Sequence, residues 1–219
     1  MIEIGIAKYP INFEFFNKDS EEYWYFLGLV SSDGYVSDSN IEICLNKKDE
    51  HILIKLRDMI CPNKPLYQKK NTHAVKFVIC SKKLCKEIKE ILHMTTNKKH
   101  SEIQFPNVPP KYLKDYIRGV IDGDGCIDTT KSYRGEKVYI GPRLRILSNR
   151  NFLLTMLEKI REQVDNNTKT VNKKGKENVW CVTFNFKTAK TILEWCYKDC
   201  TICLYRKYKK FEEVCNMKI

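Results

Sequence analysis

The sequence predicts an α+β protein made of two similar units, each in the order α-β-β-α-β-β-α. The first observation is an internal repeat: the stretch 26–36 recurs as 117–127, so that Asp33 corresponds to Asp124, 91 positions later. Hydrophobic patterns of helical and strand period then follow both copies in the same order. Both copies also carry small residues at helical spacing, which predicts that the two units meet through these helices.

The composition indicates a globular chain with an excess of positive charge. Its 219 residues carry a net charge of +12, and 42% of them are hydrophobic. The longest apolar stretch, 23–30, is far shorter than the roughly 20 residues that cross a bilayer, and no secretory pattern begins the sequence. We therefore expect no membrane contact and no secretion. The charge favours a polyanionic partner, with a solvated basic surface as the alternative.

Cysteine usage predicts a reducing, intracellular compartment. Ten cysteines in this length fall below the density of a disulfide scaffold. Four of them lie in apolar runs and are expected in the core: Cys44, Cys61, Cys80 and Cys181. The cluster of Cys196, Cys200 and Cys203 could bind zinc, but no second Cys or His pair follows at ligand spacing, which favours helix packing.

The first unit opens with the repeated helix, which ends at Asp33-Gly34 and leads directly into a strand. Asp19 with Glu22 forms a capping-box pattern ahead of this helix. The remaining expected elements are a strand at 41–45, a helix at 52–60, a strand at 75–79 and a closing helix at 84–92.

The second unit repeats this order with a longer hairpin around 132–141. Its further expected elements are a strand at 144–146, a helix at 152–160, a strand at 180–186 and a closing helix at 189–197. The polar, proline-bearing stretch 95–110 joins the units. We place the boundary near residue 105, which gives a first repeat with an N-terminal extension at 1–105 and a second repeat at 106–219.

The repeated helices have the small residues that a close helix interface needs. Each carries a pair four positions apart, which places them on one face: Gly28 with Ser32, and Gly119 with Gly123. Glycine inside a helix costs about 1 kcal/mol relative to alanine, so its presence there favours close backbone approach over chance. We expect these four residues to form the interface between the units.

Such packing would bring Asp33 close to Asp124 at the carboxyl ends of both helices. An acid is destabilised at that end of a helix, and two neighbouring acids repel each other. A single Asp-Gly could simply make the turn into the strand. Two copies side by side favour a shared divalent cation, because Mg²⁺ takes carboxylate, carbonyl and water oxygens as ligands.

The two motifs resemble those of the LAGLIDADG homing endonucleases in their single-chain form, over about residues 9–214. The matching positions are the first glycine, the last acid and the final glycine of each motif: Gly28, Asp33 and Gly34, and Gly119, Asp124 and Gly125. The stretches 99–106 and 204–211 also resemble family patterns. Ser31 departs from the family, which often has an acid where the second copy has Asp122, and we expect this departure to matter little.

The resemblance implies two four-stranded antiparallel sheets that form a basic saddle over double-stranded DNA, in a monomer that is an internal pseudo-dimer. It implies site-specific cleavage of both strands across the minor groove of a long target, as in intron homing. Asp33 and Asp124 would be the metal ligands and catalytic acids, with two or three Mg²⁺ ions at the helix interface. The protein would lie with the DNA, in the cytoplasm, the nucleoid or an organelle matrix.

Further candidate residues come from family position and from strand alternation. Lys99 and Lys207 match flanking catalytic cations of the family, and Lys47 and Asn149, just after the second strand of each unit, could position water. Alternation places five polar side chains on strand faces that suit DNA: Lys76, Arg143, Arg145, Thr183 and Asn185. The alternative for all of these is ordinary surface polarity.

Two other functions are compatible with the same fold. One is an RNA-binding maturase with the host intron RNA as partner, and the other is a DNA-binding protein without cleavage. Both motif acids and both flanking lysines are present, which favours the nuclease.

Overall fold

The computed structural model describes residues 9–68, 72–94, 103–164, 170–175 and 178–217. The elements before the join are the 3-10 helix η1 (Phe13–Phe16), α1 (Glu21–Asp33), β1 (Gly34–Val36), β2 (Asn40–Asn46), η2 (Lys47–Asp49), α2 (Glu50–Ile60), β3 (Tyr67–Gln68), β4 (Ala74–Cys80) and α3 (Lys82–Ile91). Those after it are η3 (Pro110–Tyr112), α4 (Leu113–Asp124), β5 (Gly125–Arg134), β6 (Lys137–Ser148), α5 (Arg150–Gln163), β7 (Val171–Lys174), β8 (Val179–Asn185), α6 (Phe186–Tyr197) and α7 (Tyr205–Cys215).

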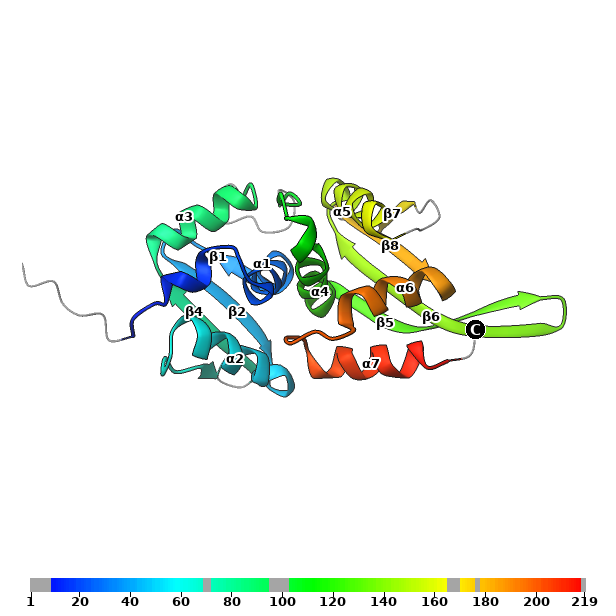
Figure 1. Cartoon of the computed structure of the whole chain (residues 1–219), viewed down its shortest axis with the longest axis horizontal. Coiled ribbons are helices and arrows are strands. Elements are labelled where there is room, and N and C mark those ends of the chain that lie inside the picture. The colour runs from blue at the N-terminus through cyan, green and yellow to red at the C-terminus, as the bar shows by residue number, and fades with distance from the viewer. Residues whose placement is uncertain (1–8, 69–71, 95–102, 165–169, 176–177, 218–219) are drawn as a thin grey trace, which may run out of the picture.

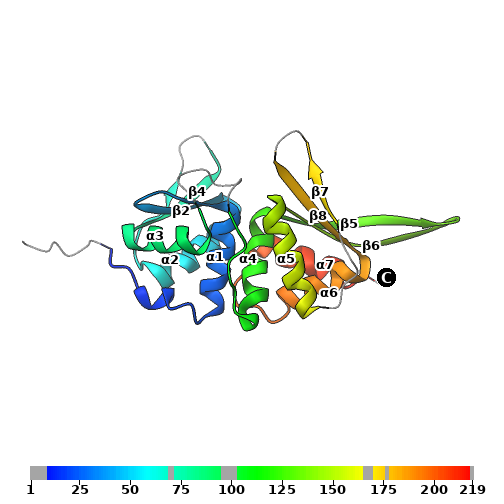
Figure 2. The ribbon, with the colours of Figure 1, turned by 90° about the horizontal axis from the view of Figure 1, so that it is seen from above.

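The strands form two four-stranded antiparallel sheets of the same topology, in the orders β1-β2-β4-β3 and β5-β6-β8-β7. The predicted fold class is confirmed. Helices α1 and α4 lie side by side at the centre, with one sheet on either side of them (Figure 1). Seen from above, both sheets lie on the same side of the molecule and the helices cover their other face (Figure 2).

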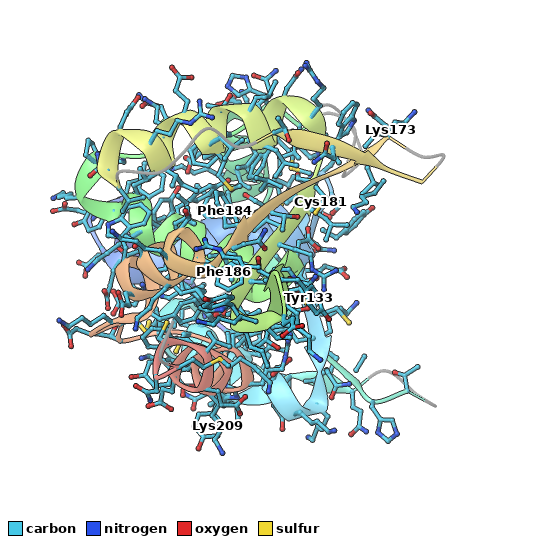
Figure 3. All side chains as sticks on the ribbon, turned by 90° about the vertical axis from the view of Figure 1, so that its right-hand side faces the viewer. Tyr133, Lys173, Cys181, Phe184, Phe186 and Lys209 are labelled. Carbon is cyan, nitrogen blue, oxygen red and sulfur yellow. The ribbon has the colours of Figure 1, made fainter. Side chains whose placement is uncertain are left out.

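Alternating side chains give each sheet one apolar and one polar face. In β2, Ile41, Ile43 and Leu45 are buried against the helices, while the residues between them are partly or fully exposed. In the second unit, Phe184 of β8 is fully buried between the sheet and its helices, and Figure 3 views this packing from the hairpin end. The polar faces are therefore free to meet a ligand.

The hairpin of β5 and β6 extends well beyond the strand that supports it. Its ladder runs from the pair Gly125 with Ile146 to Arg134 with Lys137, whereas β8 pairs with β6 only as far as Arg143. The outer part projects from the body of the molecule (Figure 2). The long hairpin expected around 132–141 is thus present, with its strands beginning at 125 and ending at 148.

Several local expectations need correction. Ser20, not Asp19, caps α1, because its hydroxyl accepts a hydrogen bond from the backbone N–H of Tyr23. Phe186 does not continue β8: it begins α6 with a φ of 49°. Cys44 and Cys80 are exposed on the polar face of the first sheet, whereas Cys61 and Cys181 are buried as expected.

Helices α1 and α4 approach so closely that their backbones touch. A Cβ added at Gly119 would lie 3.0 Å from the Cα of Gly28 and 2.8 Å from the backbone nitrogen of Leu29. A Cβ at Gly28 would likewise lie 3.1 Å from the Cα of Gly119. Real Cβ atoms do not tolerate such contacts with backbone on several sides, so only glycine fits at the crossing.

An ion pair is buried beside this crossing. Arg118 and Asp115, both on α4, are 0% and 1% exposed and lie 2.9 Å apart, Nη1 to Oδ1. Arg118 also donates to the carbonyl oxygens of Ile202 and Cys196, at 2.8 Å each. A buried charge needs partners, and here they tie α4 to the end of α6 and to the segment before α7.

The first residues of helix α7 contact the first unit. The Nε atom of Arg206 lies 2.9 Å from an Oδ2 atom of Asp49, whose side chain is almost fully buried. The backbone N–H of Tyr205 donates to Nε2 of His51 at 3.3 Å. We did not predict this helix, although Leu204, Tyr208, Phe211 and Val214 recur at helical spacing. Its N-terminus links the two units a second time.

We expect Gly119→Ala to destabilise the protein. In an exposed helix this change stabilises by about 1 kcal/mol. Here the methyl group would press on the backbone of α1, and overpacking of this kind costs about 1–3 kcal/mol. Urea denaturation measures the free energy of unfolding.

Lys86→Ala is the control, because Lys86 is exposed on α3 and surface changes stay within about 0.5 kcal/mol. A Gly119→Ala protein as stable as wild type would contradict the close approach.

Candidate functional site

The paired acids end the two central helices. Asp33 is the last residue of α1 and Asp124 the last of α4, and both are partly buried. A Cβ at Gly123 would lie 3.1 Å from Oδ2 of Asp33 and 2.6 Å from the Cβ of Ser32. The carboxylate of the first helix therefore lies against the last turn of the second. The structure places all four small residues at this interface, with Asp33 against the helix that ends at Asp124.

The strands begin immediately after the acids because the helices end abruptly. Gly34 and Gly125 have extended backbones, with φ of −77° and −80°, so neither serves a left-handed turn. A Cβ on Gly125 would instead lie 2.5 Å from the carbonyl oxygen of Ile121, and one on Gly34 2.6 Å from the Cα of Val30. These glycines permit the chain to fold back against its own helix, which fixes each acid at the helix–strand corner.

Among the candidate cations that the structure describes, Lys207 alone lies beside the acids. It lies in the first turn of α7, is only 6% exposed, and its Nζ donates to the carbonyl oxygen of Gly125, the residue after Asp124. Burial lowers the pKa of the Lys207 ammonium group below its usual range, and the nearby charge of Arg206 lowers it further. An ammonium group is thus held within the site.

A buried hydrogen-bond network surrounds another motif position, two residues before each acid. Asp122 is fully buried and accepts from the hydroxyls of Tyr25 at 2.8 Å and Tyr197 at 2.6 Å. In the first copy, Ser31 shares a 2.8 Å hydrogen bond with the hydroxyl of Tyr116. Tyr25 and Tyr116 occupy equivalent repeat positions, so each helix sends a tyrosine to the other. Ser31 is therefore part of the helix interface, and the expectation that its departure from the family motif matters little stays a prediction.

The polar face of the second sheet carries the two predicted arginines, held by an acid. Both Nε and Nη2 of Arg143 donate to the carboxylate of Asp128, at 2.7 and 2.8 Å. Arg145 donates to the same carboxylate at 2.7 Å. The hydrogen bonds from Arg143 are the main cause that lowers the pKa of Asp128. The face is positive overall, with both guanidinium groups fixed side by side.

The other predicted face residues lie where alternation placed them. Thr183 is directly opposite Arg145, and Asn185 opposite Arg143, so all four share the polar face. On the first sheet, Lys76 lies 2.9 Å from Glu42, Nζ to Oε2. A hollow of about 640 Å³ opens on that face; it is lined by Asn40, Glu42, Cys44, Tyr67, Gln68, Lys76, Val78 and Cys80.

The described residues offer hard oxygen ligands but no complete metal site. In the part of the chain that the structure describes, no three His, Cys, Asp or Glu side chains converge. Two carboxylates and the carbonyl oxygens at two helix ends suit Mg²⁺ or Ca²⁺ rather than a soft metal. A cation bound there would complete its ligand shell with water and with oxygens of a bound ligand.

Comparison with known proteins identifies the fold. No protein-family model and no curated protein matches the sequence. Among solved structures, the I-SmaMI LAGLIDADG homing endonuclease bound to cleaved DNA is 11% identical, with a TM-score of 0.60 over 88% of this chain and 87% of that one. The I-LtrWI LAGLIDADG homing endonuclease bound to target DNA is 16% identical, with a TM-score of 0.59 over 93% and 89%.

This chain has the single-chain LAGLIDADG fold. A third similar structure is I-SmaMI bound to uncleaved DNA target in the presence of calcium ions, 12% identical, with a TM-score of 0.61 over 88% of both chains. The two motifs recognised in the sequence are therefore the two central helices of a LAGLIDADG pseudo-dimer. At this identity the likeness concerns the fold.

The remaining candidates differ in where the LAGLIDADG fold puts them. Asn149 caps α5: its Oδ1 accepts from the N–H of Phe152 at 3.0 Å, and its Nδ2 donates to the carbonyl oxygen of Ile103 at 2.7 Å. Lys47 is half exposed and pairs with Glu50 at 2.8 Å. Lys99 lies outside the described residues. The geometry of Asn149 is that of a structural cap, and the roles of all three in catalysis stay predictions.

Sequence analysis did not identify three residues that hold the candidate site residues in place: Asp128, Tyr25 and Tyr197. Asp128 shares its strand face with Arg143, a relation that alternation in 125–134 could have indicated once the register was known. Tyr25 and Tyr197, the partners of Asp122, lie on other elements, and no local sequence pattern indicates that they bind it.

Within the described ranges, no helix has the length and hydropathy of a bilayer span.

Asn149→Ala should lower the free energy of unfolding by about 1 kcal/mol, the typical cost of losing an N-cap. Lys47→Ala, at the corresponding place after β2, removes only a half-exposed ion pair and should change it by less than about 0.5 kcal/mol. Urea denaturation of both variants gives the comparison. Equal stability of Asn149→Ala and wild type would show that the cap is unimportant.

Proposed function

We propose that this protein is a site-specific DNA endonuclease that cuts both strands of a long double-stranded target with the help of a divalent cation. The observation that carries the proposal is the pair of carboxylates fixed at the ends of two touching helices, between two sheets that turn polar faces to the same side. The solved LAGLIDADG structures described above, which are named as complexes with DNA, support it.

Three residues of this chain would have distinct roles in such a reaction. Asp33 and Asp124 would hold divalent cations, two or three of them at the helix interface. A bound Mg²⁺ lowers the pKa of attacking water and stabilises charge on the scissile phosphate. Lys207 adds a fixed positive charge next to Gly125, where it would face the negative charge that develops on a phosphate oxygen. The two acids, one from each helix, match the two strands to be cut.

The polar faces of the sheets would bind the DNA. Fixed guanidinium groups suit guanine, which offers two acceptors in the major groove. Because Asp128 binds both Arg143 and Arg145, it presents them in one defined orientation. The net charge of +12 would add salt-dependent affinity for phosphates. The minor groove would then lie over the acids.

The alternative partner, host intron RNA, has less support. The three similar structures named above are described as complexes with DNA. Cleavage by the purified protein would separate the nuclease from a maturase or from a DNA-binding protein without activity.

Asp33→Asn and Asp124→Asn test the proposal directly. Each should abolish double-strand cleavage of a plasmid carrying the intron-less host locus in Mg²⁺, because a carboxylate ligand is lost. Binding to the same DNA, measured by gel shift in Ca²⁺, should stay within a few-fold of wild type, since neither acid lies on the sheet faces. EDTA should stop cleavage by the wild type.

Lys86→Ala is the control, because Lys86 is exposed on α3; this variant should cleave the plasmid at the wild-type rate. If either Asn variant linearises the plasmid at nearly the wild-type rate, the shared metal site is wrong. If wild type binds the target but never cuts it, the endonuclease proposal is wrong.

Arg143→Ala should relax the preference for particular base positions, at a cost of about 1–3 kcal/mol for the preferred base. Asp128→Asn should weaken preference at the positions of both arginines, because it releases both guanidinium groups. Profiling cleavage over a library of single-base target variants measures both effects. Uniform weakening across all sequences would assign the arginines to phosphates instead.

A further inference from the structure

We propose that Asp122 is a positioning residue: it fastens the start of α7 to helix α4 and so holds Lys207 beside the site. The inference rests on the proposed function, which gives Lys207 its task. It adds a role for an acid that belongs to neither the metal ligands nor the DNA-facing strands.

Asp122 is a fully buried carboxylate at which three other elements meet. It accepts from the hydroxyl of Tyr25 on α1, from the hydroxyl of Tyr197 at the end of α6, and from the backbone N–H of Leu204 at 2.6 Å. All three partners are donors, so an ionised carboxylate satisfies them and an amide cannot satisfy them equally. Such charge-assisted bonds are stronger than neutral ones.

The link from Asp122 to Lys207 is short and continuous. Leu204 is the residue before α7, which has no side-chain cap of its own. The carbonyl oxygen of Leu204 accepts from the N–H groups of Lys207 at 2.9 Å and Tyr208 at 3.0 Å. Asp122 thus supplies an acceptor at the start of α7, and the first turn then directs Lys207 back to the carbonyl oxygen of Gly125. An anion at this end of a helix is also favoured by the helix dipole.

The two units differ at this position. Ser31, the counterpart of Asp122, donates to the carbonyl oxygen of Leu27 at 2.8 Å and shares a hydrogen bond with Tyr116, and both partners lie on the central helix pair. Among the residues that the structure describes, Ser31 therefore bonds only to the two central helices. The acid in the second copy has the additional task of holding α7, and loss of that task should affect the two strand cuts unequally.

The test compares Asp122→Asn with Ser31→Ala, which removes a buried hydrogen bond at the equivalent position. The first measurement is acetylation of Lys207 by acetic anhydride in protein without DNA, at one pH, quantified by peptide mass spectrometry. Lys209, on the outer side of α7 (Figure 3), serves as the internal reference. Asp122→Asn should raise the modification rate of Lys207 about tenfold relative to Lys209, on the scale of a lost charged hydrogen bond, and Ser31→Ala should not.

The second measurement is strand-resolved cleavage with each strand end-labelled. Asp122→Asn should slow one strand cut more than the other, so that nicked DNA accumulates, whereas Ser31→Ala should keep the wild-type ratio. If Asp122→Asn does not fold, as judged by circular dichroism, Tyr197→Phe decides, because it removes one of the three donors and should expose Lys207 to a smaller extent.

Unchanged protection of Lys207 in a folded Asp122→Asn protein, or an equal rise in Ser31→Ala, would overturn the proposal. So would an equal slowing of both strand cuts. Because the acetylation measurement needs no cleavage, a wild-type protein that cuts no DNA would count against the proposed function and leave the positioning result to stand or fall separately.

Discussion

The contact between the backbones of α1 and α4 is the constraint on which the rest of the structure depends. Without side chains at Gly28 and Gly119, the helices approach so closely that a Cβ added to either glycine would lie 3.0–3.1 Å from the Cα of the other. That approach sets the angle between the two sheets and places both helix ends at one point. The carboxylate of Asp33 therefore lies against the last turn of α4, the helix that ends at Asp124. Any change in the crossing would move the sheets and the acids at once.

The helix crossing is nearly symmetric, but the groups around it are not. Each helix sends a tyrosine to the position two residues before the other helix's acid, Ser31 in one case and Asp122 in the other. The serine satisfies its tyrosine with a neutral hydrogen bond. The buried aspartate has its pKa raised by desolvation and needs several donors, which α6 and the segment before α7 provide. The repeats thus differ by a serine at position 31 and an aspartate at position 122, and the second unit, which has the aspartate, also has an additional helix, α7.

The fold could be predicted from sequence because its main determinants are local or repeated. Periodicity located most helices and strands, and the 91-residue offset located the interface. Contacts between distant elements could not be predicted. The arginines on β6 were expected on the polar face, but their capture by Asp128 depends on strand register. Ser20 caps α1, and Asp19 instead accepts a hydrogen bond at 2.7 Å from Lys111, a residue more than ninety positions away. The contacts of α7 with Asp49 and His51 likewise join residues more than 150 positions apart.

The contact between the start of α7 and the first unit affects when the protein can complete its folding during synthesis. Arg206 and Tyr205 meet Asp49 and His51 only after more than 150 further residues have been made. Domains generally fold from the N-terminus during synthesis, and contacts between distant residues form late. The contacts of Asp49 and His51 with α7 can therefore form only after the end of the chain has been synthesised. A product released early would lack Phe211 and Val214, which are buried apolar residues of α7 itself, and the apolar surface that they cover would be exposed to quality-control proteases.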